Sequence, residues 1–222
     1  MNRMRKIIIG KNSNLYKNYK NDFLSFFDFA ISHNEIASFH FLPNDFIFVL
    51  SYPRSISGIK KMVILMKQLK NNKILLLSTC SAILNNITSC YYYPKIKFLQ
   101  EKYFSKTFHN LIIFRVGTVI RKNDYDNYYG LCVINDKVFF RMIREFIKRN
   151  PKEQLVTRFD ILDFKGSFFE SHLYDIYCRL IFSLIPFPCI LRPLDVILRL
   201  FNIRWYGYGA LTKIMSEKKQ IL

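Results

Sequence analysis

Three side chains with complementary chemistry follow one another at helical spacing near the middle of the chain: Tyr93, Lys97 and Glu101. Positions i, i+4 and i+8 of a helix lie on one face, so a helix here places a phenol, an ammonium and a carboxylate in a row. A tyrosine transfers protons near neutral pH only where its phenolate is stabilised, and an ammonium one turn away lowers the phenol pKa. We therefore predict that Tyr93 is a general acid or base and that Lys97 assists it.

A second register of the same pattern pairs Tyr91 with Lys95. In that register Pro94 falls inside the spacing, and Glu101 no longer shares the face. A proline is tolerated in the first turn of a helix, directly after Tyr93. The spacing therefore favours Tyr93 with Lys97.

A hydroxyl partner for the proton transfer is expected at the end of a neighbouring strand. The run Ile74–Leu77 is apolar without interruption, which indicates a strand buried on both faces, and hydroxyl residues follow it directly. Thr79 is the first choice for orienting the substrate oxygen, with Ser78 and Ser81 as alternatives.

A turn near the start of the chain is the candidate phosphate site. The β-branched run Lys6–Ile9 predicts a buried first strand, and Gly10, Asn12 and Ser13 follow before a segment that predicts a helix through Phe27. The N–H groups at such a strand–turn–helix junction bind phosphate. Of the three glycines in a dinucleotide fingerprint only Gly10 is present, so an ordinary turn in which Ser13 caps the helix stays open as the alternative.

The elements that must position these residues alternate between strand and helix. Further strands are predicted at Glu35–Phe41 and at Asp45–Leu50, which ends at Ser51, and Ser55 caps a helix whose apolar residues follow a 3.6-residue period. This alternation predicts an α/β fold, a doubly wound parallel sheet of Rossmann-like type. Ligands of such sheets bind at the carboxyl ends of the strands, where Gly10, Ser51 and residues 78–81 fall.

The motifs resemble the short-chain dehydrogenase/reductase superfamily, in its extended nucleotide-sugar epimerase and dehydratase branch. Tyr93-Pro-Lys-Ile-Lys97-Phe-Leu-Gln-Glu101 is similar to the branch's Y-x-x-x-K-x-x-x-E helix, Leu77-Ser-Thr-Cys80 to its strand-end hydroxyl motif, and Leu111–Gly117 to its following strand. The resemblance implies an NAD or NADP cofactor, a proton-transferring Tyr93 with Thr79 as hydroxyl partner, and Lys97 on the nicotinamide ribose. It also implies that the turn of Gly10, Asn12 and Ser13 holds the pyrophosphate, with Ser51 beside the cofactor.

Composition limits the partners. The net charge of +18 favours anionic partners, such as phosphorylated substrates, anionic lipid or nucleic acid, although the lysines are scattered as in a lysine-rich chain without such a partner. Nucleic acid ranks last, because no recognised motif or arginine-rich stripe is present. The five cysteines form no C-x-x-C pair, so we expect neither a metal site nor a disulfide framework, and we expect a cytoplasmic protein.

The last part of the chain changes character. We predict a cofactor-binding domain over residues 1–170 and a helical C-terminal extension over residues 171–222, which is apolar and basic. No uninterrupted apolar run of about 20 residues exists to span a membrane. Residues 180–213, with Arg204, Trp205, Tyr206 and Lys213, are open to two interpretations: a patch that lies on an anionic membrane surface, or a cap over the sheet edge or a homodimer contact.

Together these features predict an enzyme. The resemblance implies an NAD(P)-dependent epimerase, dehydratase or reductase that acts on a nucleotide-linked or lipid-linked sugar carrying phosphate or diphosphate, in surface polysaccharide synthesis. The alternative is a degenerate, non-catalytic Rossmann-fold protein that binds a partner or a membrane surface.

Overall fold

The computed structural model describes residues 3–88, 91–121, 132–149, 153–161, 168–200 and 207–217. The chain divides into two compact units, and each unit is built from segments that are far apart in the sequence. The first unit combines Met1–Ser78, Ile96–Arg115 and Val138–Val156. The second combines Thr79–Lys95, Val116–Lys137 and Thr157–Leu222. The division of the chain at residue 170 stays a prediction.

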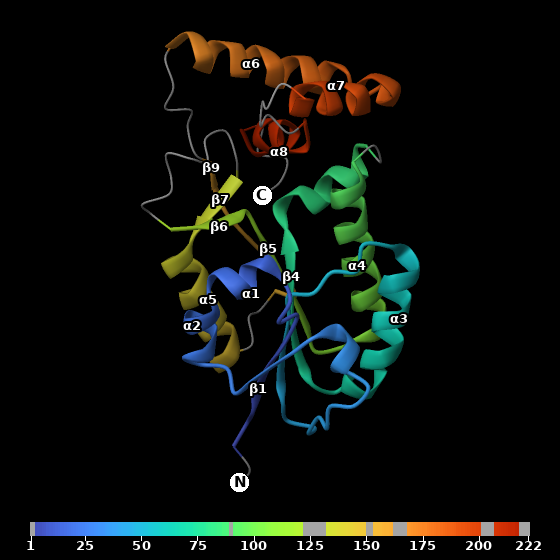
Figure 1. Cartoon of the computed structure of the whole chain (residues 1–222), viewed down its shortest axis with the longest axis vertical. Coiled ribbons are helices and arrows are strands. Elements are labelled where there is room, and N and C mark those ends of the chain that lie inside the picture. The colour runs from blue at the N-terminus through green and yellow to red at the C-terminus, as the bar shows by residue number, and fades with distance from the viewer. Residues whose placement is uncertain are drawn as a thin grey trace. The chain divides into compact units, whose positions relative to one another are not determined.

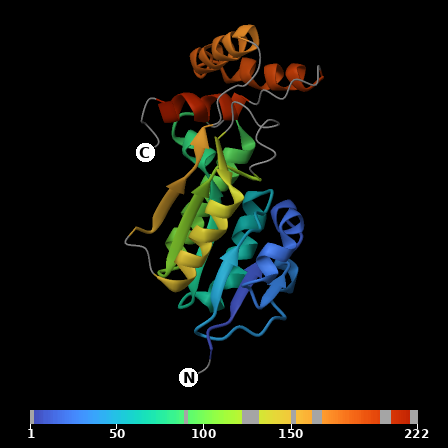
Figure 2. The same cartoon turned by 90° about the vertical axis from the view of Figure 1, so that its left-hand side faces the viewer.

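A six-stranded sheet with the order β2-β1-β3-β4-β5-β8 forms the centre of the first unit (Figure 2). Its strands are β1 (Lys6–Ile9), β2 (Phe29–Ile31), β3 (Phe46–Val49), β4 (Lys73–Thr79), β5 (Leu111–Val116) and β8 (Leu155–Arg158). The pairs β1–β2, β1–β3 and β3–β4 are parallel. After β1 the chain forms β2 on one side of β1 and then crosses to the other side, where β3, β4 and β5 follow in order. The direction in which strands are added therefore reverses at β1, and ligands of such sheets bind at that point. The predicted doubly wound Rossmann-like fold is confirmed.

Helices cover both faces of this sheet (Figure 1). One face carries α1 (Asn14–Asn18), α2 (Lys20–Leu24) and α5 (Asp136–Lys148), and the other carries α3 (Ile56–Met66) and α4 (Tyr92–Thr107). A short 3-10 helix, η2 (Lys67–Leu69), ends α3. The predicted cap of α3 is present, because the Ser55 Oγ atom accepts a hydrogen bond of 3.1 Å from Gly58 N.

The central strands β1, β3, β4 and β5 are buried on both faces, as the unbroken apolar runs predicted, whereas the edge strands β2 and β8 are partly exposed. Alternate residues of a strand point to opposite faces. On β1, Ile7 and Ile9 contribute to a core shared with α3 and α4. On the opposite face the packing is aromatic: Phe48 of β3 meets Phe23 of α2 with 6.1 Å between ring centroids, and Phe23 meets Phe140 of α5 at 5.0 Å.

Side chains fasten the amino end of the sheet. The carboxylate of Asp45, directly before β3, accepts two hydrogen bonds from the Arg5 guanidinium at 2.9 and 2.6 Å and one from Leu42 N at 2.7 Å. The Asn72 amide, directly before β4, donates to the carbonyl oxygens of Leu42 and Asp45. Three chain segments that precede or start strands are thereby held in one network.

The described residues of the second unit form a small sheet, a 3-10 helix and three α-helices. Its sheet has the order β6-β7-β9, with β6 (Thr118–Ile120), β7 (Cys132–Asn135) and β9 (Asp160–Ile161). Its helices are the 3-10 helix η3 (Cys80–Asn86), α6 (Phe168–Ser183), α7 (Pro188–Leu200) and α8 (Gly207–Glu217). Buried residues of η3, α6, α7 and α8 form one apolar cluster. No helix among the described residues is long and apolar enough to cross a bilayer.

Three predicted elements are wrong in detail. Residues 35–41 form no strand: the second strand is Phe29–Ile31, and a 3-10 helix, η1 (His33–Glu35), follows it. The helix predicted after the Gly10 turn is interrupted at Tyr19, which separates α1 from α2. In the extension, the helix that Pro193 is expected to start begins at Pro188 instead, so Pro193 lies inside α7.

Candidate active site

The helix α4 carries the predicted catalytic pair. Tyr93 and Lys97 lie four residues apart in this one continuous helix, with Pro94 in its first turn. Tyr91 precedes the helix and is buried in the apolar cluster of the second unit. The geometry therefore favours the register of Tyr93 with Lys97, and it removes Tyr91 as a surface group.

Lys97 is buried at the carboxyl ends of β3 and β4. Only 5% of its surface is exposed, its Nζ atom donates a hydrogen bond of 3.2 Å to Leu77 O, and the ring of Tyr52 covers it with 4.6 Å from Nζ to the centroid. Burial lowers the pKa of Lys97 to about 8, and the nearby charge of Glu101 opposes part of that lowering. At neutral pH Lys97 still holds its positive charge.

Two buried polar atoms beside Lys97 have no hydrogen-bond partner among the described residues: Ser78 Oγ and Gln100 Oε1. Ser78 follows Leu77, the carbonyl partner of Lys97, and Gln100 lies one helical turn beyond Lys97. The other end of the Gln100 amide donates a hydrogen bond of 2.9 Å to Ser51 O. Buried polar groups are nearly always satisfied, so this region suits a ligand that brings hydroxyl groups. These residues fit the ribose of a nicotinamide cofactor.

The third residue of the predicted row, Glu101, is paired. Its carboxylate accepts two hydrogen bonds from the Arg115 guanidinium of β5, at 2.9 and 2.6 Å, and only 4% of Glu101 is exposed. Lys97, Glu101 and Arg115 together carry one excess positive charge in the interior. That excess charge attracts an electron-rich or anionic ligand.

Gly10 and Ser51 come together where β1 and β3 end. Gly10 has φ +126°, and a Cβ atom there would lie 2.6 Å from Ser51 N. Ser51 N in turn donates to Ile9 O at 3.1 Å. Glycine is required here by the close approach of two protein strands, whether or not a ligand is bound.

The remaining N–H groups of the turn are largely used within the protein. Gly10 N and Lys11 N both donate to Ile31 O, and Ser13 N donates to Gly10 O. The Ser13 hydroxyl caps α1 by accepting from Tyr16 N at 3.1 Å. Asn12 is exposed at the tip of the turn. Of the predicted phosphate contacts, Asn12 is the one with a side chain open to solvent.

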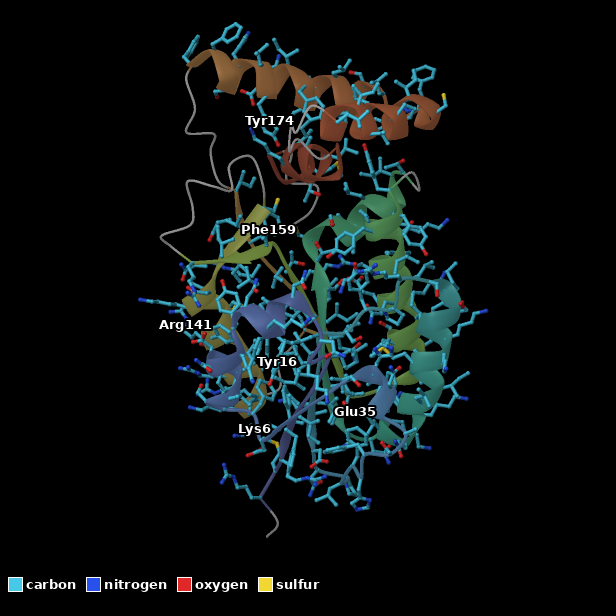
Figure 3. All side chains as sticks on the ribbon, viewed as in Figure 1. Lys6, Tyr16, Glu35, Arg141, Phe159 and Tyr174 are labelled. Carbon is cyan, nitrogen blue, oxygen red and sulfur yellow. The ribbon has the colours of Figure 1, made fainter. Side chains whose placement is uncertain are left out.

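Glu35 is a candidate that sequence reasoning missed. It lies just beyond β2, its Oε1 atom accepts from Lys11 Nζ at 2.7 Å, and its Oε2 atom accepts from Ser32 N at 2.6 Å (Figure 3 labels it). The hydrogen bond from Lys11, together with the Ser32 bond, lowers the pKa of Glu35 to about 2. An acid about 20 residues past the first glycine contacts the adenosine ribose in Rossmann sites. The spacing of Glu35 from Gly10 could have identified it. The second strand was expected to begin at Glu35, however, so Glu35 was not considered as a residue that follows the strand.

Thr79 and Ser81, two of the predicted hydroxyl partners, lie together in the second unit. Their oxygens are 3.1 Å apart, and Thr79 Oγ1 also accepts from Ser81 N at 3.4 Å, which caps η3. Tyr93 belongs to the same unit and is half-buried. Ser78, the third hydroxyl, belongs to the first unit with Lys97, Gly10 and Ser51.

The first unit also contains a cavity of about 350 Å³. Its walls come from α4, β5 and the approach to β8, and include the paired Glu101 and Arg115 together with Phe98, Ile113 and Leu155. None of the predicted cofactor residues lines it. We therefore place the candidate site at the carboxyl ends of the strands, where Lys97 and the unpaired buried atoms lie, and not in this cavity.

Sequence comparison identifies no relative, since neither a family model nor a curated protein matches the chain. Solved structures do resemble it. The capsular polysaccharide assembling protein CapF from Staphylococcus aureus has a TM-score of 0.52 and 18% identity over 72% of this chain, which spans 55% of CapF. TunA, described as an NAD-dependent NDP-hexosamine 5,6-dehydratase of tunicamycin biosynthesis, has a TM-score of 0.52 and 11% identity over 71% of this chain and 76% of its own.

A third similar structure is dTDP-4-dehydrorhamnose reductase from Bacillus anthracis, solved in complex with NADP. It has a TM-score of 0.54 and 11% identity, and the match covers 72% of this chain and 75% of that one. At these identities the likeness establishes the fold alone: the chain has the Rossmann-like fold that these structures share. The fold that the motif resemblance implied is confirmed.

Proposed function

We propose that this protein is an NAD(P)-dependent enzyme of the short-chain dehydrogenase/reductase type. The observation that carries the proposal is the buried, charged Lys97 at the strand ends, beside two buried polar atoms without partners and one helical turn after Tyr93. The nicotinamide cofactor supplies hydride exchange when bound. The residues of the chain supply binding, orientation and proton transfer.

Each residue has a distinct role in this proposal. Lys97 keeps its charge at neutral pH, because its pKa of about 8 is still above 7. Its ammonium would hold the nicotinamide ribose and stabilise the phenolate of Tyr93, which would exchange a proton with the substrate hydroxyl. Thr79 orients that hydroxyl.

The carboxyl ends of β1 and β3 hold the rest of the cofactor. Gly10 and Ser51 would lie beneath the cofactor, and Asn12, with Ser13 beside it in the turn after β1, would contact the pyrophosphate. Glu35 accepts hydrogen bonds from the adenosine ribose. A carboxylate at this place favours a free 2′-hydroxyl over a 2′-phosphate, so we propose NAD as the preferred cofactor.

The substrate in this proposal is a sugar carrying phosphate or diphosphate, linked to a nucleotide or a lipid. The fold is shared with proteins described as acting in capsular polysaccharide assembly and on nucleotide-linked hexosamines. The net charge of +18 also favours a phosphorylated ligand. We propose epimerisation, dehydration or reduction of such a sugar, in the cytoplasm.

Thermal unfolding with each nucleotide tests the cofactor site. A ligand that binds only the folded state raises the melting temperature, so millimolar NADH or NADPH is expected to do so. Tyr93→Phe keeps the ring and is expected to keep this shift while losing turnover of nucleotide-sugar substrates. If wild type and Tyr93→Phe show the same rise in melting temperature and the same turnover, Tyr93 takes no part in the reaction.

A second function, a degenerate Rossmann protein without catalysis, is favoured by one observation. Gly10 N and Lys11 N are occupied by Ile31 O, and Tyr16 fills the core at the place where a third glycine falls. These features remove two phosphate donors from the turn. An unchanged melting temperature at millimolar concentrations of both nucleotides would support this function over the first.

A further inference from the structure

The helix α6 is apolar on two separate stripes. Tyr174, Tyr177, Cys178 and Ile181 are buried in the cluster of the second unit with residues of α8, and Figure 3 shows Tyr174 on the side of α6 toward α8. A second stripe is exposed to solvent and consists of Phe169, Leu173, Ile176 and Leu180. Spacings of four, three and four residues place these side chains on one helix face. Packing of the second unit explains the first stripe only.

The next helix continues the exposed apolar surface. On α7, Leu191 is buried, whereas Ile190, Val196, Ile197 and Leu200 are exposed, Leu200 by 79%. Phe187, in the turn before α7, is also exposed. Figure 1 shows α6 and α7 one after the other along the same border of the second unit, with α8 on one side of both. We call the exposed apolar side chains of residues 168–200 the α6–α7 face.

The α6–α7 face exposes more large hydrophobic side chains than a typical solvent-facing surface. It contains more than half of the large exposed hydrophobic residues among the described residues, and Phe168 at its start is 91% exposed. Single exposed apolar residues are common on proteins, but a contiguous set on two successive helices marks an interaction surface.

We propose that the α6–α7 face binds an anionic lipid bilayer, with its side chains inserted at the boundary between head groups and acyl chains. Phenylalanine, leucine, isoleucine and valine make up this face, as in helices that lie in a membrane interface. The exposed Arg179 borders the stripe on α6. The carboxylate of Asp175 on the same helix is neutralised by Lys213 Nζ at 3.1 Å, so it adds little repulsion from lipid phosphates.

The net charge of the chain favours a bilayer over a second copy of the chain as the binding partner of the α6–α7 face. Each chain carries a net charge of +18, which draws it toward an anionic surface. Two copies that meet through the same face bring two such charges together, and the repulsion opposes their association. The occupant that agrees with both the apolar residues and the charge is therefore anionic lipid.

The predicted membrane segment changes accordingly. The prediction covered residues 180–213 and counted Lys213 among the basic residues at the head groups. Lys213 is buried, paired with Asp175 and placed 5.2 Å from the Tyr174 ring centroid, so it is a core residue. The face begins at residue 168, on α6. Arg204, Trp205 and Tyr206 lie outside the described residues.

Vesicle flotation with the full chain tests the proposal, and it needs no cofactor or substrate. Wild-type protein is expected to float with vesicles of phosphatidylcholine containing phosphatidylglycerol, and to float less at high salt or with phosphatidylcholine alone. The double variant F169S/I176S removes two highly exposed side chains of the face. Its partitioning is expected to fall about tenfold or more.

The matched control is Ile64→Ser on α3, which removes an isoleucine that is 62% exposed in the first unit and should leave flotation unchanged. Circular dichroism and melting temperature confirm that each variant is folded. The proposal is overturned if wild-type protein stays with the soluble fraction, or if F169S/I176S floats as well as wild type. A wild-type dimer in light scattering that F169S/I176S breaks, without flotation, would assign the face to a second copy instead.

Discussion

The ring of Tyr52 lies over the ammonium of Lys97, with 4.6 Å between the Lys97 Nζ atom and the ring centroid. Tyr52 directly follows Ser51, whose carbonyl oxygen is held by Gln100 of α4. The segment after β3 is thereby fixed to the helix that carries Lys97. The Tyr52 ring therefore covers part of the Lys97 ammonium at this end of the sheet.

Replacing Tyr52 by alanine should raise the pKa of Lys97 from about 8 toward its usual 10.5. Loss of the cation–π contact, worth about 1–2 kcal/mol, by itself lowers the Lys97 pKa. Burial is the largest cause of the present value, however, and the smaller side chain admits water to Lys97, so the net change is a rise. An NMR titration of the Lys97 side chain measures the change. Tyr52→Phe keeps the ring and should keep a pKa near 8, and an unchanged pKa in Tyr52→Ala would show that Tyr52 does not exclude water.

Replacing Lys97 by methionine should change how stability depends on pH. Below pH 8 both folded and unfolded chains hold the Lys97 proton, and between pH 8 and 10.5 only the unfolded chain holds it. The free energy of unfolding contributed by Lys97 therefore rises with pH across this window. The variant lacks this rise and is more stable at pH 7, by at most about 3 kcal/mol.

Urea unfolding at pH 7 and pH 10 measures this difference for Lys97→Met. Burial also lowers the pKa of Lys73, but Lys73 is present in both proteins and cancels in the comparison. Parallel pH curves for wild type and variant would show that the Lys97 ammonium is not buried in solution.

Glu101→Gln should destabilise the protein strongly. It leaves the Arg115 guanidinium buried without its carboxylate, which typically costs about 3–5 kcal/mol. The control is Arg3→Gln, which removes an ion pair with 3.8 Å between Arg3 Nη2 and Asp28 Oδ1 and with Arg3 83% exposed, and it should cost less than about 1 kcal/mol. Equal urea midpoints for the two variants would contradict a buried pair at Glu101.

Gly10→Ala should separate the structural role of the first turn from its ligand role. The new Cβ atom meets Ser51 N, and the positive φ is strained for alanine, so we expect a loss of about 3 kcal/mol in unfolding free energy. Asn12→Ala, at the exposed tip, should leave stability unchanged and reduce the nucleotide-induced rise in melting temperature. An unaffected rise in Asn12→Ala would remove this side chain from the cofactor site.

Glu35→Gln should reduce the preference for NADH over NADPH. The wild-type carboxylate repels a 2′-phosphate and accepts from a 2′-hydroxyl, so NADH is expected to bind at least about tenfold more tightly. Titration of each nucleotide into wild type and variant measures the ratio. Because Glu35 also accepts from Ser32 N, the melting temperature without ligand is the control for folding. A wild-type preference for NADPH would exclude Glu35 from this role.

The sheet could be predicted because its strands are read from local patterns. Ile74–Leu77 is apolar without interruption, and Ser55 has the chemistry of a helix cap, so β4 and α3 followed from a few residues each. The strand Phe29–Ile31 could not be predicted in the same way, since three residues are too few to show a strand pattern. Its strand conformation depends on hydrogen bonds to β1, which is distant in sequence. The alternating residues 35–41 gave a false strand in its place.

The candidate site was only partly predictable. Lys97 and Glu101 follow from helical spacing, but their surroundings depend on tertiary contacts between residues far apart in sequence. Gln100 bonds to Ser51, 49 residues earlier, and Glu101 bonds to Arg115 on a separate strand. Strands β6 and β7 of the small sheet were also missed, because they are only three and four residues long.

The network of Arg5, Asp45 and Asn72 has an evolutionary consequence. These side chains fasten the amino end of the parallel sheet and take no part in the candidate site at its carboxyl end. The contacts that align the strands are thus separate from those proposed to recognise a ligand, so a change in a loop after a strand leaves this network in place. A lineage could exchange substrates, or lose a glycine of the phosphate turn, and still pass on a foldable chain.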